Sequence, residues 1–198
     1  MFKDKILQKL HKRVEKEFGI IPDIQILKPN EYFSDLAQSI IGQQLSTKVA
    51  DKIVERVKAS YPKKKIDAKY TRNLNVENLR ACGISNSKAQ YIKNIAEAFL
   101  DETIKYKNFP KMSDEDIIAE LVTIKGVGRW TAEMFLIFSL GRSDVFSAGD
   151  YGLRKAVSKA YGVDINIKPK ELIQLASQWS PNRTLASRIL WKSLELTN

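Results

Sequence analysis

"IKGVGRW", residues 124–130, separates two segments that are rich in strong helix formers. A glycine costs a helix interior about 1 kcal/mol relative to alanine, so Gly126 and Gly128 indicate a short turn rather than a continuous helix. We expect one helix to end at about Thr123 and the next to begin at Arg129. The segment therefore predicts a helix-hairpin-helix unit.

The turn has the features of a phosphate-binding site. Glycine permits positive φ and close approach of another molecule, and the first N–H groups of the following helix point outward without partners inside that helix. Lys125 and Arg129 add positive charge beside them. Such a contact grips a nucleic-acid backbone without reading its bases. The alternative is an ordinary turn between antiparallel helices.

The composition supports a polyanionic partner. The chain has 198 residues, of which 43% are hydrophobic, enough for one compact domain or two small lobes. Its 33 Lys and Arg residues against 23 Asp and Glu residues give a formal net charge of +10. This excess favours nucleic acid first and an acidic membrane surface second, although a basic protein can also simply be soluble. The basic residues are scattered instead of gathered on one amphipathic face, which disfavours the membrane.

Targeting signals and metal-binding cysteines are absent from the sequence. No segment approaches the roughly 18 consecutive apolar residues of a membrane span, so we expect a protein inside the cell, cytoplasmic or nucleoid-associated in a prokaryote and nuclear in a eukaryote. The single cysteine, Cys82, excludes an intrachain disulfide and a cysteine-rich zinc or iron–sulfur site. His11, the only histidine, lies in a charged N-terminal helix and is expected at the surface.

Apolar residues recur at helical spacing along almost the whole chain, which predicts an all-α fold of roughly ten helices. The first helix is expected to end at Gly19 in a left-handed cap, and the last to begin with Ser180 and Pro181 as N-cap and first residue. Residues 24–27, "IQIL", are the one candidate for a short strand, and the basic residues 62–72 are expected to form a solvated connection. Further helices are expected around residues 33–41, 49–57, 91–100, 113–121, 129–140, 151–162 and 168–179.

A longer segment, "LVTIKGVGRWTAEMFLIFSLGRSDVFSAGDYGLRKAV", resembles the signature of the helix-hairpin-helix (HhH-GPD) DNA glycosylase superfamily. Within it, "GVGRWTAEMF" and "DYGLRKA" are most similar to the 3-methyladenine DNA glycosylase II branch, as are "SIIGQQLSTKVADKI" and "GISNSKAQYI" elsewhere in the chain. The match runs from about residue 31 to the C-terminus. The resemblance implies a two-lobed all-α fold with the active cleft between the lobes.

The resemblance also implies a domain organisation. All of residues 1–198 would form a single catalytic domain. One lobe would comprise about residues 31–137, including the hairpin at 113–137. The other would comprise about residues 1–30 and 138–198.

Asp150 matches the catalytic aspartate of the family by position. Cleavage of an N-glycosidic bond builds positive charge on the sugar, which a fixed carboxylate can stabilise while it helps to align a water molecule. The alternative role for a loop aspartate ahead of a helix is an N-cap. The two roles can coexist.

Trp130 occupies the place where bifunctional members carry a lysine nucleophile that forms a Schiff base. The resemblance therefore implies a monofunctional enzyme that uses water, since Lys125 matches no catalytic lysine of the family. Trp130 and Trp191 resemble pocket residues that would stack on an electron-poor alkylated purine, and Tyr151 resembles a pocket tyrosine. Met134 stands where relatives can carry tyrosine, which bears on substrate range. For the aromatic residues the alternative is core packing.

The "GQQLS" loop resembles the segment from which relatives insert a wedge side chain when a base leaves the stack; its alternative is an ordinary interhelical turn. The family's hairpin can also hold a sodium or potassium ion through backbone carbonyls, here those of Val122, Ile124 and Val127, whereas no cofactor is required. The expected DNA-contacting residues are Gln43, Gln44, Leu45, Lys125, Gly126, Val127, Gly128, Arg129 and Thr131.

These observations predict a monomeric, monofunctional DNA glycosylase of base excision repair. It would act on double-stranded DNA containing damaged bases, release alkylated purines such as 3-methyladenine and leave an abasic site. One alternative is a bifunctional glycosylase and lyase acting on oxidised bases. The other is a non-catalytic module that binds DNA through the hairpin. Adenine and thymine-glycol branches often carry a four-cysteine cluster, which a single cysteine excludes.

Overall fold

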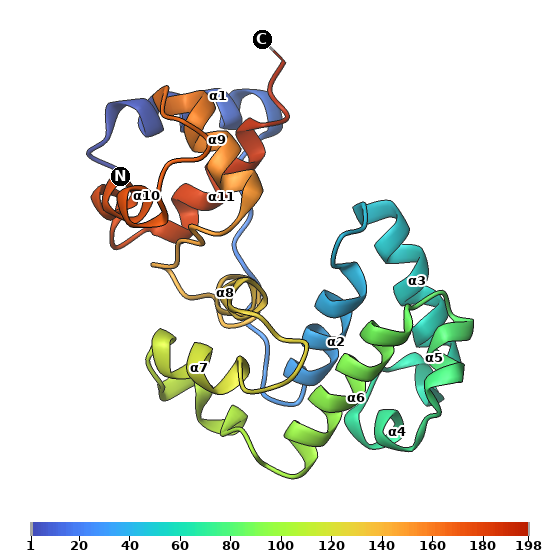
Figure 1. The fold of residues 1–198 in the computed structure, drawn as a ribbon. Coiled ribbons are helices and arrows are strands. Elements are labelled where there is room, and N and C mark those ends of the chain that lie inside the picture. Colours follow the sequence, from blue (N-terminus) through green and yellow to red (C-terminus); the bar gives the residue numbers. More distant parts are fainter. Residues whose placement is uncertain (1, 198) are drawn as a thin grey trace. The chain divides into compact units, whose positions relative to one another are not determined.

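The computed structural model describes residues 2–197, and all regular structure in this range is helical. No helix in the described range is long and apolar enough to cross a membrane. The predicted all-α fold is confirmed, whereas the candidate strand at residues 24–27 is wrong: these residues adopt no regular structure, and no second strand in residues 2–197 is there to pair with them. The α-helices are α1 (Lys5–Phe18), α2 (Tyr32–Gly42), α3 (Thr47–Ser60), α4 (Ala68–Asn73), α5 (Val76–Ala81), α6 (Asn86–Leu100), α7 (Asp114–Leu121), α8 (Arg129–Phe138), α9 (Tyr151–Tyr161), α10 (Pro169–Ala176) and α11 (Arg183–Ser193) (Figure 1).

The described chain divides into two compact units. Unit 1 comprises residues 2–25 and 136–197, and unit 2 comprises residues 26–135. Helix α8 contributes to both units because the division falls within it.

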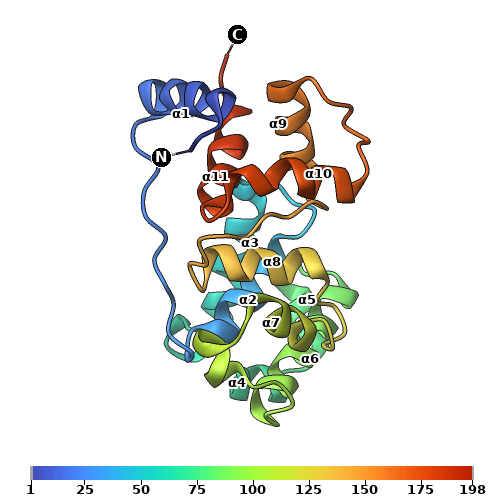
Figure 2. The ribbon, with the colours of Figure 1, turned by 90° about the vertical axis from the view of Figure 1, so that its left-hand side faces the viewer.

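Helices α1, α9, α10 and α11 surround the hydrophobic core of unit 1 (Figure 2). The largest fully buried side chain is that of Trp179, whose indole N–H donates to Asp4 Oδ2 at 2.8 Å. Asp4 also caps α1 through the amides of Ile6 and Leu7, and it accepts a hydrogen bond from the Tyr161 hydroxyl. Burial opposes ionisation of Asp4, but these hydrogen bonds outweigh it and lower the pKa of the carboxyl.

Two predicted helix ends in unit 1 differ from the structure. Gly19 follows α1 with φ 80° and ψ −175°, so the positive φ is present but the backbone is outside the left-handed helical region that we expected. The last helix begins at Arg183 rather than at Pro181. The reason is the Asp144 carboxylate, which accepts a hydrogen bond from the Arg183 amide at 3.1 Å. It also accepts one from the Ser180 hydroxyl at 2.8 Å, so Ser180 does not cap the helix.

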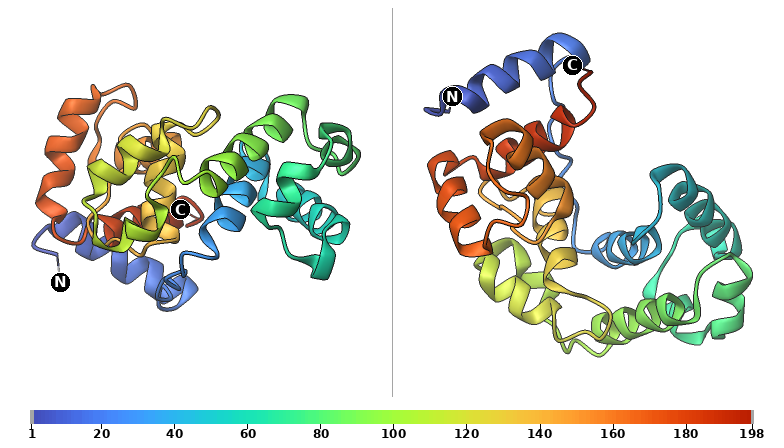
Figure 3. Two further views of the ribbon diagram at one scale, coloured as in Figure 1. Left: turned by 90° about the horizontal axis from the view of Figure 1, so that it is seen from below. Right: turned by 45° about the horizontal axis from the view of Figure 1, so that its top comes forward.

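Helix α6 is central to unit 2, where it packs against α2, α4 and α5 (Figure 3, left panel). The predicted solvated connection at residues 62–72 is only partly correct. Lysines 63–65 are exposed, but Ile66 and Thr71 are buried, and the second half of the segment belongs to α4. Cys82 is buried at the end of α5.

Candidate active site

The glycine turn between α7 and α8 is part of unit 2. Ser113 caps α7 by accepting a hydrogen bond from the Asp116 amide, and α8 begins at Arg129, as predicted. Gly126 has φ 108°, and a Cβ atom at this position would overlap the Tyr91 ring. A Cβ atom at Gly128 would meet no atom within 4 Å. The chain itself therefore requires glycine at 126, whereas the surface at 128 is open.

The two basic residues of the hairpin are in different electrostatic environments. The Arg129 guanidinium donates to Glu115 Oε1 at 2.7 Å and to Glu133 Oε1 at 2.9 Å, and the first bond lowers the pKa of the Glu115 carboxyl. Lys125 is exposed and forms no ion pair in the described chain. Its carbonyl accepts the Asn94 side-chain amide at 2.9 Å, which anchors the turn to α6. Lys125 is thus the free cation of this turn, while two carboxylates compensate Arg129.

Two of the predicted DNA-contacting residues have buried side chains. Val127 is 4% exposed and Thr131 is 2% exposed, so neither side chain is accessible at the surface of the turn. The Thr131 hydroxyl accepts the Gln43 side-chain amide at 3.0 Å, which links α8 to the "GQQLS" loop. In this loop Gln44 has φ 59°, and Leu45 is 38% exposed.

The backbone carbonyls suggested for a monovalent cation lie in the same turn. The Ile124 carbonyl accepts the Val127 amide at 2.9 Å. A carbonyl oxygen has two lone pairs, so this bond leaves one for a cation. The Ile124 carbonyl is therefore compatible with an ion that prefers neutral oxygen ligands, and ligation by Val122, Ile124 and Val127 together stays a prediction.

Asp150 lies at the start of α9 in unit 1. Its Oδ1 accepts the Leu153 amide at 2.7 Å and the Trp191 indole N–H at 2.8 Å. The N-cap role considered from the sequence is thus present. Trp191 comes from α11, so a second helix fixes the orientation of the carboxylate. Gly152 leaves room for this contact, because a Cβ there would lie 3.1 Å from both Asp150 Oδ1 and Trp191 Cδ1.

Arg154 holds the loop that leads to Asp150. Its guanidinium donates to the carbonyl of Ala148 at 3.2 Å, and to those of Ile165 and Ile167 at 3.1 and 2.7 Å. A planar guanidinium with several donors can join separate backbone segments in a fixed geometry. The bonds join the loop before α9 to the segment after it, and they brace the helix start that carries Asp150.

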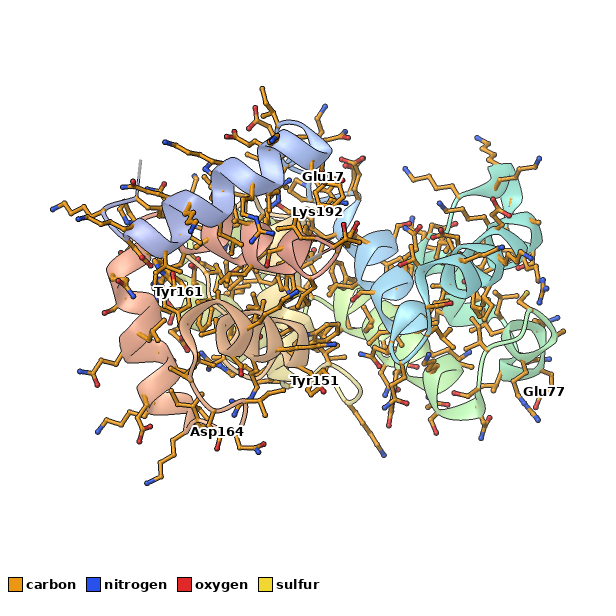
Figure 4. All side chains as sticks on the ribbon, turned by 90° about the horizontal axis from the view of Figure 1, so that it is seen from above. Glu17, Glu77, Tyr151, Tyr161, Asp164 and Lys192 are labelled. Atoms are coloured by element: carbon orange, nitrogen blue, oxygen red, sulfur yellow. The ribbon has the colours of Figure 1, made fainter. Side chains whose placement is uncertain are left out.

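An aromatic pair lines a cavity of about 370 Å³ in unit 1. Phe138 stacks on Trp191 with ring centroids 5.9 Å apart and an interplanar angle of 28°. Phe18 also lines this cavity, and the Lys192 ammonium lies 4.2 Å from its ring centre; Figure 4 shows Lys192 near the end of α1. Phe138 was not predicted as a pocket residue from the sequence. Its spacing of four residues from Met134 and eight from Trp130, on one helix face, was the available signal.

The remaining predicted pocket residues differ in exposure. Trp130 is 40% exposed and Met134 is buried, both in the part of α8 that belongs to unit 2. Tyr151 is 69% exposed at the first position of α9 (Figure 4). Of the predicted site residues, the structure brings Asp150 into contact with Trp191, and Gln43 into contact with Thr131.

Comparisons with known proteins identify relatives over most of the chain. Residues 37–182 match the model of the HhH-GPD superfamily of base excision DNA repair proteins. The chain is 32% identical over 189 residues to the DNA-3-methyladenine glycosylase 1 of Schizosaccharomyces pombe. The aligned residues cover 94% of this chain and 83% of the relative. It is 34% identical over 173 residues to a DNA-3-methyladenine glycosylase of Saccharomyces cerevisiae, of which it spans 57%.

Two solved structures of 3-methyladenine DNA glycosylases are also similar to this chain. The S. pombe 3-methyladenine DNA glycosylase in complex with abasic DNA has a TM-score of 0.84 and 31% identity, with 98% of both chains covered. A DNA-3-methyladenine glycosidase from Bacillus halodurans has a TM-score of 0.81 and 32% identity, covering 98% of this chain and 86% of its own. The chain belongs to the HhH-GPD superfamily of base excision DNA repair proteins.

Proposed function

We propose that this protein is a monofunctional DNA glycosylase that hydrolyses the N-glycosidic bond of alkylated purines, such as 3-methyladenine, in double-stranded DNA. The observation that carries the proposal is the Asp150 carboxylate, held at the start of α9 by the Leu153 amide and the Trp191 indole in an HhH-GPD chain. The relatives named above, which are DNA-3-methyladenine glycosylases, support the substrate class.

The proposed reaction breaks the bond between C1′ of the sugar and the base nitrogen, and a water oxygen forms the new bond to C1′. Positive charge develops on the sugar before water attacks, and the Asp150 carboxylate stabilises that charge. Two donors on Oδ1 hold the carboxylate in place, so little reorganisation is needed as the charge appears. The base leaves with the electron pair of the broken bond, the attacking water gives up a proton to solvent, and an abasic site remains.

Phe138 and Trp191 are proposed to receive the extruded base. Their stacked rings line an apolar cavity, and alkylated purines are electron-poor and often cationic. An aromatic face attracts such rings by about 0.5–2 kcal/mol. The roles of Trp130, Met134 and Tyr151 as further pocket residues are proposals that rest on their positions in the sequence.

The absence of a Schiff-base lysine at position 130 leads us to propose hydrolysis without strand cleavage. The hairpin backbone and Lys125 would grip phosphates, and the loop with Gln43, Gln44 and Leu45 would enter the duplex when the base leaves it. A monomer is proposed because one protein copy suffices to grip one face of a duplex.

The test is product analysis on methylated duplex DNA. Released bases are quantified by chromatography, and strand breaks are counted before and after alkali. We expect free 3-methyladenine, breaks only after alkali, and no covalent complex on borohydride treatment. Breaks without alkali together with a trapped complex would identify the bifunctional alternative. Binding without release from methylated or oxidised duplexes would identify a non-catalytic DNA-binding module.

A further inference from the structure

The "GQQLS" loop begins where α2 ends, and a lysine from another helix holds this end. The last carbonyls of a helix have no partner within it and need donors from elsewhere. The Lys88 ammonium donates to the carbonyl of Ile41 at 2.9 Å and to that of Gln43 at 2.5 Å. Lys88 lies in the first turn of α6, more than forty residues away in sequence. A cation at a helix C-terminus also interacts favourably with the helix dipole.

Apart from the Gln43 side chain, whose amide donates to the Thr131 hydroxyl, the residues of the loop do little to set its shape. Gln43 follows α2 with φ −51° and ψ 131°, and it is not the glycine that commonly ends a helix. Gln44 then has a positive φ of 59°, which side chains other than glycine adopt rarely. An unfavourable backbone conformation persists only where surrounding contacts impose it. The two hydrogen bonds from Lys88 reach carbonyls on the N-terminal side of Gln44. On its C-terminal side, the Leu45 amide donates to the Gly42 carbonyl.

The Lys88 side chain is half-buried where it makes these contacts. Lys88 lines a cavity of about 250 Å³ together with Gln43, Gln44, Leu45 and Ser85. Desolvation lowers the pKa of the amine. The Ser85 hydroxyl caps the Lys88 amide at 3.3 Å, so the backbone from which the side chain extends is also fixed. A surface lysine that served only solubility would stay in water with mobile rotamers.

We propose that Lys88 is a positioning residue that holds the Gln43–Leu45 loop in the conformation that enters the duplex when a base is extruded. The role rests on the proposed function, because it assumes that the loop acts on DNA. Lys88 does not touch the reacting atoms. Its loss is expected to impair base extrusion and to leave the chemical step intact.

A second lysine of α6 provides a matched control. The Lys93 ammonium donates to the carbonyls of Arg72 and Leu74 at 2.9 and 2.6 Å, at the end of α4. Lys93→Met therefore removes the same number of hydrogen bonds and the same charge from the same helix, without touching the loop. Lys88→Met keeps the length of the apolar stem, and Lys88→Arg restores a cationic donor.

The first experiment measures excision from two substrates under single-turnover conditions: methylated duplex DNA and methylated single-stranded DNA. A single strand requires little or no extrusion. We expect Lys88→Met to slow release from the duplex about tenfold and from the single strand less than about twofold. Lys88→Arg should recover most of the loss, and Lys93→Met should affect both substrates equally.

The second experiment does not depend on catalysis. A duplex with 2-aminopurine opposite a tetrahydrofuran abasic analogue becomes more fluorescent when a protein disturbs base stacking. At saturating protein, Lys88→Met should give a smaller rise than wild type and Lys93→Met should give the wild-type rise. If wild type releases no base but this difference persists, the proposed glycosylase function fails and the role of Lys88 stands. If Lys88→Met matches Lys93→Met in both assays and in thermal unfolding, Lys88 only stabilises the fold and the proposal is overturned.

Discussion

The hairpin between α7 and α8 and the loop that ends at Asp150 both lead into the N-terminus of a helix, and different interactions hold them. At the hairpin, the φ of 108° and the adjacent Tyr91 ring make glycine necessary at position 126. At the Asp150 loop, side chains from elsewhere in unit 1 dominate: Trp191 fixes the carboxylate and Arg154 ties the loop to residues 165 and 167. The first region depends on a glycine conformation and on close packing against Tyr91 of α6, and the second depends on hydrogen bonds from distant side chains.

The difference determines which substitutions each region tolerates. The hairpin should respond to added side-chain volume at one glycine, since its geometry leaves no space there. The Asp150 loop should respond to the loss of individual hydrogen-bond donors. The two regions therefore predict separable effects on stability, catalysis and DNA affinity.

The largest effect on stability is expected for Gly126→Ala. A positive φ and overlap with Tyr91 together should cost about 2–4 kcal/mol in the free energy of unfolding, measured by urea denaturation. In the Tyr91→Gly background, which removes both the ring and the Tyr91 Cβ atom that would lie 2.4 Å from the added methyl group, the steric part should disappear and only the conformational part should remain. An equal cost in both backgrounds would show that the overlap with Tyr91 does not constrain the turn.

Asp144 offers the corresponding test at the start of α11, the helix that carries Trp191. Hydrogen bonds from Arg183 lower the pKa of Asp144 below its ordinary value of 3.8. A carboxyl with a lowered pKa in the folded state stabilises the protein above its unfolded-state pKa, and this contribution is lost as the pH falls through the folded-state pKa. Asp144→Asn should therefore lower the stability at pH 7 by about 1–2 kcal/mol.

Thermal unfolding of wild type and Asp144→Asn at pH 7 and at pH 3 provides the measurement. The difference between the two proteins should shrink on acidification, because wild type loses the contribution that the variant already lacks. A difference that stays constant down to pH 3 would contradict the assigned role of the ionised carboxylate.

Trp191→Phe tests the donor at the Asp150 loop. The variant keeps an aromatic ring but removes the N–H that bonds Asp150 Oδ1, so base release should slow about tenfold with a stability loss of about 1 kcal/mol. Trp179→Phe is the matched control, since it also removes a tryptophan–aspartate hydrogen bond in unit 1, the one to Asp4. Trp179→Phe should lower the free energy of unfolding, while the folded variant should release the base at about the wild-type rate. Equal rates of base release for the two variants would show that Trp191 does not position Asp150.

The smallest effect on stability is expected for Gly128→Ala, since no atom of the chain lies within 4 Å of the added methyl group. The free energy of unfolding should change by less than about 0.5 kcal/mol. The affinity for duplex DNA should nevertheless fall, as measured by fluorescence anisotropy at two salt concentrations, because the methyl group would obstruct the close approach of a phosphate. Unchanged affinity for duplex DNA would show that the hairpin does not contact DNA at position 128.

The same difference explains what could be predicted from the sequence. Helical periodicity and the spacing of Gly126 and Gly128 are local, so most of the longer helices and the hairpin turn followed from them, whereas the short helices α4 and α5 were not predicted. The contacts of Asp150 with Trp191, of Phe138 with Trp191 and of Lys88 with the end of α2 each join residues distant in the chain. No local pattern encodes such contacts. The start of α11 was missed for this reason, because Asp144 supplies the cap from outside the segment.

The measurement that tests the central claim most directly is single-turnover release of 3-methyladenine from methylated duplex DNA by wild type and Asp150→Asn, with DNA binding and thermal unfolding measured on the same samples. Asparagine keeps the shape of the side chain and can still accept the Leu153 and Trp191 hydrogen bonds, but it removes the negative charge. We predict that release falls at least about a hundredfold, while the variant stays folded and binds DNA. Release by Asp150→Asn at the wild-type rate would contradict the catalytic role of Asp150.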